Sequence, residues 1–442
     1  MEKVWSSLKK NLQQTTSSIA FIPTIFAISG LLLAFFTITI EYDQRVIDLK
    51  EKIEFLLITN KEDGRVLLGT LVASIISLMV FSFSMVMVVL NGASSNFSPR
   101  VLPALIGNKP HQVILGFYLC TIIYSLIMLV NFQSDLTNVL PSLGILISMI
   151  FGVTSLCLFI FFIHSISKSI QVESILENIF DKTMLQLEGY GLKERQLENK
   201  IPDFDGWDNL CVEQAGYLKQ LKTDKLIELT EKHNFQIVLR KHIGSFLVKD
   251  YPFLQVSNTD QLSSEIIEEL KSCFTFYPDD QINDHYLFGF KQISEIGVKA
   301  LSTGLNDPGT AIKSLNLLTV LFIRRMEINE PLYETTSSGK VSIIYTPVSL
   351  KELIFQNLIP IRTFGKGDVM VMLKMLEVIK NMIYADDEKK KYRLVLVTAL
   401  RSCIEAADAA IKNHLDREQI NEVISLIDNK LNGIYRLERL QM

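Results

Sequence analysis

The chain of 442 residues has a net charge of −4 and a mean hydropathy of +0.26, although 21% of its residues are charged. This combination indicates long apolar blocks joined to an ordinary soluble part. The slightly acidic balance lacks the basic surface that a nucleic acid requires, so we expect no nucleic-acid partner. The five cysteines are scattered without a CxxC pair and the six histidines are dispersed, so we expect no metal and no cofactor.

Four apolar stretches are each long enough to cross a bilayer, which takes about 20 residues. None of them contains Asp, Glu, Lys or Arg. Because a proton-coupled carrier normally places an ionisable side chain within its spans, this absence argues against that class. The spans are predicted at about residues 19–40, 67–90, 113–130 and 143–163, which makes the lipid bilayer a partner.

The charges of the connecting segments orient the spans. The segment before the first span carries Lys3, Lys9 and Lys10 against one acid. The loop between the second and third spans carries Arg100 and Lys109 and no acid. Since basic loop residues mark the cytoplasmic side, we predict a multi-pass protein whose N-terminus and C-terminal domain are both cytoplasmic.

Small and hydroxyl-bearing residues recur at helical spacing along one face of the second span. This face consists of Thr70, Ser74, Ser77, Phe81, Ser84 and Asn91. Hydroxyl groups with a phenylalanine constriction can line a pore. Small residues also let membrane helices pack closely, and for one helix by itself we favour that interpretation. A chain with only four spans would form a pathway between subunits on a symmetry axis, so the pore hypothesis requires a homo-oligomer.

A polar segment at the cytoplasmic end of the second span offers two interpretations. Ser94, Ser95 and Arg100, with His164 at the exit of the fourth span, can form a mouth that gathers an ion, a small anion or lipid headgroups. Arg100 is equally well explained as an anchor on the positive side of the membrane. We give the anchor and the mouth equal weight.

The sequence after the fourth span becomes that of a soluble protein. Apolar residues continue at helical spacing, which predicts that the fourth span extends as an amphipathic stalk helix over residues 169–200. Residues 201–257 mix strand and helix patterns and predict a small α/β module, and residues 258–442 predict a helical cytosolic domain. The predicted fold is therefore an α-helical membrane protein, with a four-helix transmembrane domain at residues 1–168 and a mainly helical cytosolic domain containing a small α/β module.

The stretch "ALSTGLNDPGTA", residues 300–311, lies between two helical patterns and is the most distinctive motif of the soluble part. Gly304 can end the first helix in the left-handed conformation, and Asn306 or Asp307 can cap the second, with Pro308 as its first residue. We favour this structural interpretation. The alternatives are an anion on the exposed N–H groups near Thr310, or a cation on the oxygens of Asn306 and Asp307.

Three stretches of the chain resemble a known bacterial family. They are "SSNFSPRVL" (94–102), "FFIHSISKSIQV" (161–172) and "FGFKQISEIGVKALSTGLNDPGTA" (288–311). They are similar to motifs of a predicted membrane protein family, the domain of unknown function numbered twenty-two fifty-four. Its signature usually ends ALSPGINDP-x-TA, whereas this chain has Thr303 at the proline and Gly309 at a bulky residue. The resemblance implies the four-span topology and a bacterial inner (plasma) membrane, and it implies no catalytic residues.

Two functions remain open from the sequence. The leading hypothesis is a homo-oligomeric integral membrane ion channel or pore that is gated by its cytosolic domain through the stalk helix. The alternative is a membrane-anchored sensor or scaffold whose cytosolic domain binds a ligand or a partner. The chain contains no Ser/His/Asp set, Gly-rich phosphate loop or HExxH motif, so we expect no enzyme.

Overall fold

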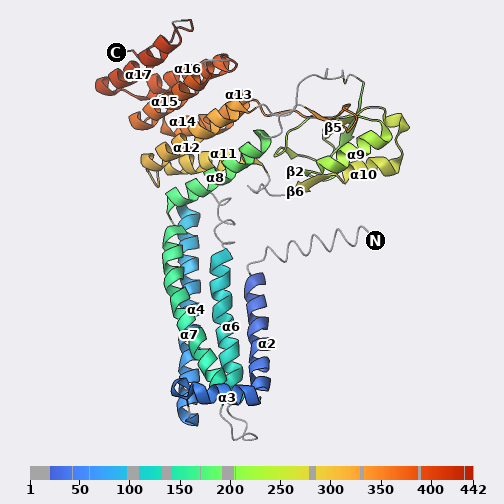
Figure 1. Cartoon of the computed structure of the whole chain (residues 1–442). Helices are drawn as coiled ribbons and strands as arrows, with labels where there is room; N and C mark the ends of the chain where they lie inside the picture. Colours follow the sequence, from blue (N-terminus) through green and yellow to red (C-terminus); the bar gives the residue numbers. More distant parts are fainter. Residues whose placement is uncertain are drawn as a thin grey trace. The chain divides into compact units, whose positions relative to one another are not determined.

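The computed structural model describes residues 20–41, 43–58, 60–96, 109–131, 141–169, 171–191, 204, 206–277, 285–328, 333–386, 390–432 and 434–441. The chain divides into two compact units. The first, which we call the membrane unit, holds helices α2 to α7, and the second holds all elements from α8 onward (Figure 1).

The membrane unit contains four helices that are long and apolar enough to cross a bilayer, counted over the described residues. They are α2 (Phe21–Ile40), α4 (Lys61–Asn96), α6 (Lys109–Asn131) and α7 (Ser142–Ser169). The four predicted spans are therefore confirmed as candidate membrane helices. A short helix, α3 (Gln44–Lys52), lies across one end of this bundle and is followed by a single 3-10 turn, η1 (Glu54–Leu56) (Figure 1).

Helix α6 is the central helix of the membrane unit. In its most apolar stretch of 18 residues, half of the residues are buried, whereas the corresponding share is 28% for α7 and 17% each for α2 and α4. Helix α2 approaches α6 closely because Gly30 faces Cys120: a Cβ atom at Gly30 would lie 2.8 Å from the Cys120 carbonyl oxygen. Glycine allows such backbone approach between membrane helices, where packing rather than the hydrophobic effect drives association.

The prediction that the fourth span continues as one unbroken stalk helix is wrong. Helix α7 ends at Ser169 and a separate helix, α8, runs from Val172 to Gly191. The apolar stripe of α8, which includes Leu176 and Leu187, is buried, and the helix packs on α11 (Tyr286–Ala300) and α12 (Pro308–Glu327) within the second unit. The apolar spacing in the sequence does not reveal this break, because both helices have a buried side and the pattern continues from one helix to the next.

The rest of the helical part of the second unit follows α12 in the chain. Its members are α13 (Leu350–Asn357), α14 (Ile359–Gly365), α15 (Val369–Ala385), α16 (Arg393–Ala410) and α17 (His414–Lys430). Helix α15 is packed against α12, α16 and α17, and eight of its residues are buried, which makes it the centre of this bundle.

The α/β part of the second unit is larger than the predicted module at residues 201–257. Its early elements are β1 (Asp208–Cys211), β2 (Gly216–Leu221), α9 (Thr223–His233), β3 (Ile237–Leu239), β4 (Phe246–Leu247) and β5 (Pro252–Val256). Its later elements are η2 (Thr259–Gln261), α10 (Ser264–Lys271), β6 (Phe274–Tyr277), β7 (Tyr333–Thr335) and β8 (Val341–Ile344). All five later elements begin after residue 257, so the α/β part does not end at the predicted boundary.

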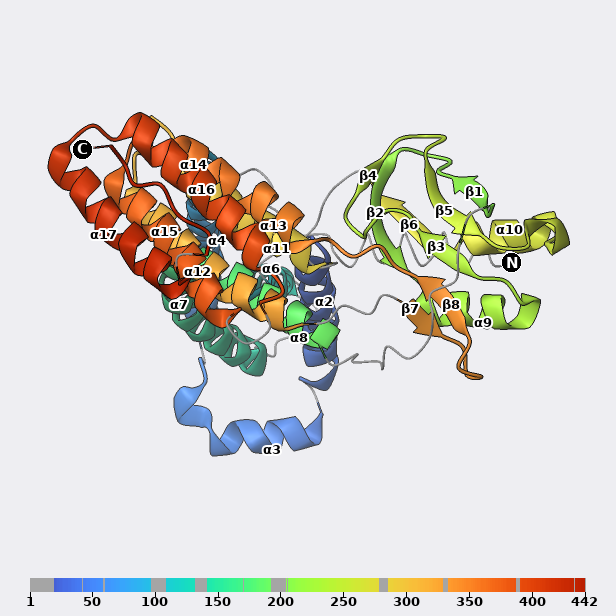
Figure 2. The same ribbon diagram turned by 90° about the horizontal axis from the view of Figure 1, so that it is seen from above.

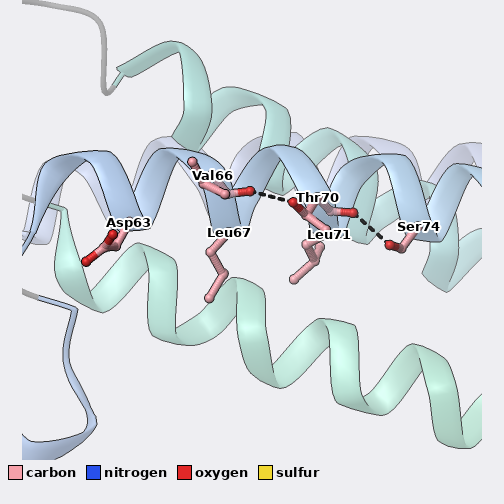
Figure 3. Close-up of a pocket in the computed structure, with 6 residues that line it drawn as sticks. All are labelled: Asp63, Val66, Leu67, Thr70, Leu71 and Ser74. Carbon is pink, nitrogen blue, oxygen red and sulfur yellow. Dashed lines mark hydrogen bonds between the residues drawn. The ribbon is translucent and has the colours of Figure 1, made fainter.

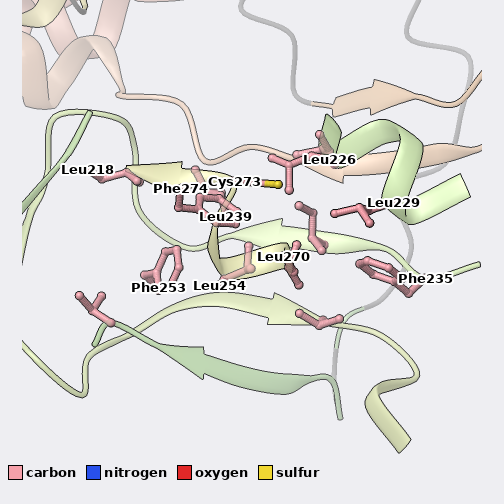
Figure 4. Close-up of a cluster of buried hydrophobic side chains, with 14 of the residues drawn as sticks. Leu218, Leu226, Leu229, Phe235, Leu239, Phe253, Leu254, Leu270, Cys273 and Phe274 are labelled. Carbon is pink, nitrogen blue, oxygen red and sulfur yellow. The ribbon is translucent and has the colours of Figure 1, made fainter. Parts of the chain in front are cut away.

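The strands form one sheet in the order β1-β5-β3-β8-β7 and another in the order β4-β2-β6. Strand β8 pairs in parallel with β3, which lies about a hundred residues earlier, and Figure 2 shows the β7–β8 hairpin beside β3 and α9. Local patterns cannot show such long-range pairing. The core between the sheets contains Phe253 and Phe274, whose rings meet edge-on at 5.2 Å (Figure 4). The Phe276 ring meets Phe253 in the same way at 5.4 Å.

Candidate functional site

The six residues predicted to line a pore share one face of α4, and this face points away from the packed side of the helix. The exposed residues are Thr70, Ser74, Ser77, Phe81, Ser84 and Asn91. On the opposite side, Leu68, Val72 and Ile75 are buried against neighbouring helices. The six residues therefore form one surface, which we call the outward face of α4.

The hydroxyl groups of the outward face are hydrogen-bonded to their own helix. Each donates to a backbone carbonyl four residues earlier, at 2.8 Å for Thr70 and Ser74, 3.0 Å for Ser77 and 2.9 Å for Ser84. This bonding satisfies the donors in hydrocarbon, while hydroxyl lone pairs stay available to a polar partner. The face is compatible both with helix packing and with lining an ion path.

A hollow of about 480 Å³ lies beside the first turns of α4 (Figure 3). Its lining residues are Asp63, Val66, Leu67, Thr70, Leu71 and Ser74. Two members of the outward face, Thr70 and Ser74, thus share this hollow with the exposed carboxylate of Asp63. Further along the helix, the Phe81 ring is 51% exposed and packs edge-on against Phe159 of α7, with ring centroids 5.8 Å apart. The phenylalanine considered as a pore constriction therefore packs on one side against a helix of its own subunit.

The predicted cytoplasmic mouth falls largely outside the described residues. The side chains of Ser94 and Ser95 and the whole of Arg100 belong to that part. His164 is exposed on α7, whereas the neighbouring Ser165 lies 3.2 Å from Nε2 of the buried His111 on α6. Of the two histidines at this end of the bundle, it is His111 that the structure joins to a polar partner.

The interior of the membrane unit holds a second set of polar residues, which the sequence analysis missed. Among the described residues, eight buried hydroxyl-bearing side chains come from all four candidate spans, and we call them the interior hydroxyl column. They are Thr37, Ser82, Tyr118, Thr121, Tyr124, Ser125, Ser148 and Ser155. The Tyr124 hydroxyl donates to Oγ1 of Thr37 at 3.2 Å, and the Thr121 and Ser155 hydroxyls are 3.4 Å apart. The signal in the sequence was the helical spacing of Tyr118, Thr121 and Ser125.

A buried ion pair closes one end of this column. Glu41 directly follows α2 and is only 1% exposed. Its Oε1 lies 2.6 Å from Nζ of Lys50 on α3 and accepts the backbone N–H of Leu143, in the first turn of α7, at 3.1 Å. Burial of a carboxylate requires such partners. Because Glu41 lies one residue beyond the predicted span, its burial could not be read from hydropathy.

The signature corner forms a capped turn between α11 and α12 in the second unit. Asp307 is the N-cap of α12 and accepts the backbone N–H and the hydroxyl of Thr310 at 3.1 and 2.6 Å. Pro308 is the first helical residue, as predicted. The left-handed residue is Asn306, with φ of 46°, and not Gly304, because asparagine tolerates this conformation and the turn closes two residues later. Both carboxylate oxygens of Asp307 are therefore used as hydrogen-bond acceptors in the cap.

We expect Asp307→Ala to cost about 1 kcal/mol of stability, while Asp307→Ser keeps most of the cap. Hydrogen bonds from the Thr310 hydroxyl and backbone N–H lower the pKa of Asp307. The stabilisation is thus present above the unfolded pKa of about 3.9 and is lost as the pH falls through the lower folded value. The measurement is the melting temperature of the purified protein between neutral and acidic pH. A wild-type advantage that stays constant down to the acid limit would contradict this assignment.

Comparison with known proteins places the chain in a family. Uncharacterized protein Mb1321c of Mycobacterium bovis is 22% identical over 372 residues, which cover 81% of this chain and 71% of that protein. Uncharacterized protein Rv1290c of Mycobacterium tuberculosis has the same identity and coverage. No solved structure matches the chain. The profile of a family described as "Predicted membrane protein (DUF2254)" matches residues 16–381, which include all four candidate spans, and the chain belongs to this family.

Proposed function

We propose that the protein is a homo-oligomeric channel or pore of the bacterial inner membrane, with the outward face of α4 lining the path between subunits. The observation that carries this proposal is the direction of that face. Its polar residues lie opposite the packed side of α4, so one subunit leaves them uncovered. A closed ring of copies would bring equivalent faces together around an axis and remove them from the lipid.

The proposed orientation of the protein in the membrane and the proposed selectivity of the path are both inferred from the distribution of charge. With basic segments on the cytoplasmic side, the N-terminus and the second unit are cytoplasmic. The six residues of the outward face carry no charge and Arg100 follows α4 in the chain, so we propose a small anion as the preferred permeant, although Asp63 shares the hollow at the first turns of α4. In this proposal the protein is not an enzyme, because its polar residues line a path and do not form a nucleophile with a base.

Gating by the second unit is supported by the connection between α7 and α8. Only residues 170 and 171 separate the two helices in the chain. Helix α8 is packed on α11 and α12, and Lys313 of α12 donates to Glu177 of α8 at 3.1 Å. A ligand or partner that moves α8 would therefore act on the end of α7 through a two-residue linker.

The test is single-channel recording of the purified protein in planar bilayers, with chemical cross-linking to count subunits. We expect discrete currents, a lower conductance in Ser77→Leu and a leakier closed state in Phe81→Ala. The matched control is Thr154→Leu, because Thr154 on α7 also donates to its own helix, at 2.8 Å to the Ile150 carbonyl, but lies off the outward face.

Two results would contradict the channel. One is a protein that is monomeric in native lipid, and the other is conductance that changes equally in Ser77→Leu and Thr154→Leu. A folded oligomer that shows no current when voltage, membrane tension or pH is changed would instead favour the membrane-anchored sensor or scaffold. In that case ligand binding to the second unit becomes the property to measure.

A further inference from the structure

The interior hydroxyl column follows the central helix of the membrane unit. Tyr118, Thr121 and Ser125 are fully buried and succeed one another at steps of three and four residues, which places them along one side of α6. The other helices add hydroxyls at matching levels: Ser155 of α7 meets Thr121, and Ser82 of α4 lies beside Tyr118. Polar side chains are thus aligned inside the subunit, away from the outward face of α4.

Several members of this column have unused hydrogen-bonding capacity. Ser82 Oγ and Tyr118 OH are buried beside each other with no partner beyond that mutual contact, and Ser125 Oγ is buried and makes no hydrogen bond to any other described residue. The second carboxylate oxygen of Glu41, Oε2, is also buried and accepts no hydrogen bond from any described residue. Leaving such groups without a hydrogen-bond partner inside a membrane protein is strongly unfavourable. Their alignment therefore points to a guest that can both accept and donate hydrogen bonds, because each hydroxyl does both.

Proton-accepting groups stand at the two ends of the column. At one end Glu41 faces Lys50 of α3, the Leu143 N–H of α7 and the Tyr124 side of α6. At the other end His111 faces the Ser165 hydroxyl and the Phe162 ring of α7. From His111 to Tyr124, α6 rises by roughly 20 Å, which is a large part of the hydrocarbon thickness.

We propose that the interior hydroxyl column is a proton path through each subunit, running between Glu41 and His111. Its bound guest is water, which bridges the hydroxyls that do not reach one another. A proton taken up at one end is passed on as each hydroxyl or water accepts a proton from one neighbour and releases its own to the next. Every O–H bond broken is replaced by one formed, and no electron is transferred. The path is independent of the outward face and of subunit assembly, so it goes beyond the proposed channel.

The test uses the full-length protein in liposomes that contain a trapped pH-sensitive dye. A potassium gradient with valinomycin drives protons inward, and the rate of internal acidification is measured. The variants Tyr118→Phe and Thr121→Val remove a hydroxyl with almost no change of shape. We expect each to slow acidification by about tenfold or more. Ser125→Ala, a smaller change in packing, serves as the second variant if either substitution disturbs folding.

The matched control is Thr154→Val, which removes a hydroxyl of α7 that belongs to neither the interior hydroxyl column nor the outward face and should leave proton flux unchanged. Two outcomes overturn the proposal: wild-type protein that acidifies vesicles no faster than empty ones, and folded interior variants that keep the wild-type rate. Ion currents in the same vesicles separate the two proposals. Ser77→Leu should alter those currents and not the proton flux, whereas Thr121→Val should do the reverse.

Discussion

Gly289→Ala is expected to destabilise the second unit strongly, although alanine is a better helix former than glycine by about 1 kcal/mol. Gly289 lies in α11 against α8, and a Cβ atom there would be 1.7 Å from Oγ1 of Thr183 and 2.8 Å from its Cβ. Thr183 is buried, β-branched and bonded through its hydroxyl to the Ile179 carbonyl at 2.6 Å, so it cannot move aside within α8. The two helices must separate, at a cost of roughly 3 kcal/mol.

The measurement is thermal unfolding of the purified full-length protein, with limited proteolysis to detect release of α8. Gly189→Ala is the control, because Gly189 lies on α8 with no atom near its missing side chain, and it should be neutral. Thr183→Ala in the Gly289→Ala background should restore part of the lost stability by removing the clashing hydroxyl. Equal melting temperatures for Gly289→Ala and Gly189→Ala would show that α8 is not held against α11 in this way.

Lys50→Met is expected to destabilise the membrane unit by about 3–5 kcal/mol, because it leaves the buried carboxylate of Glu41 without its positive partner. The pair is well shielded, with 13% of the Lys50 side chain and 1% of the Glu41 side chain exposed. Lys50 also donates to the Glu41 carbonyl at 3.2 Å, so it holds α3 to the end of α2 through two contacts. The remaining support for the carboxylate would be the Leu143 N–H at the beginning of α7.

The double variant Glu41→Gln with Lys50→Met should recover much of the loss, since it removes the uncompensated charge as well as its partner. Lys52→Met is the control, because Lys52 is exposed on the same helix. Unfolding of detergent-solubilised protein gives the comparison. If Lys50→Met and Lys52→Met were equally mild, the ion pair would contribute little to stability. If the double variant were worse than Lys50→Met, the amide would have broken the contact with α7.

The sequence by itself determined the four membrane helices and the family, because each depends on local information. Twenty consecutive apolar residues are read from composition alone, and the motifs at residues 94–102, 161–172 and 288–311 are contiguous. The cap at Asp307 was also predictable, since capping joins residues three positions apart. The periodicity of α4 placed Phe81 and five polar residues on one face for the same reason.

The tertiary structure decided every feature that depends on distant partners. The break between α7 and α8 arises because α8 buries its apolar stripe on α11 and α12, more than a hundred residues away in the chain. The parallel pairing of β3 with β8 likewise joins residues that are about a hundred positions apart in the chain. Both polar sets of the membrane unit consist mainly of hydroxyl-bearing residues, and only packing shows which set is buried and which is exposed. Burial around α6 encloses the interior hydroxyl column, which ends at Glu41 and includes Ser82 of α4, whereas the hydroxyls on the outward face of α4 stay exposed. A helix shows its periodicity locally, but its neighbours decide which side is covered.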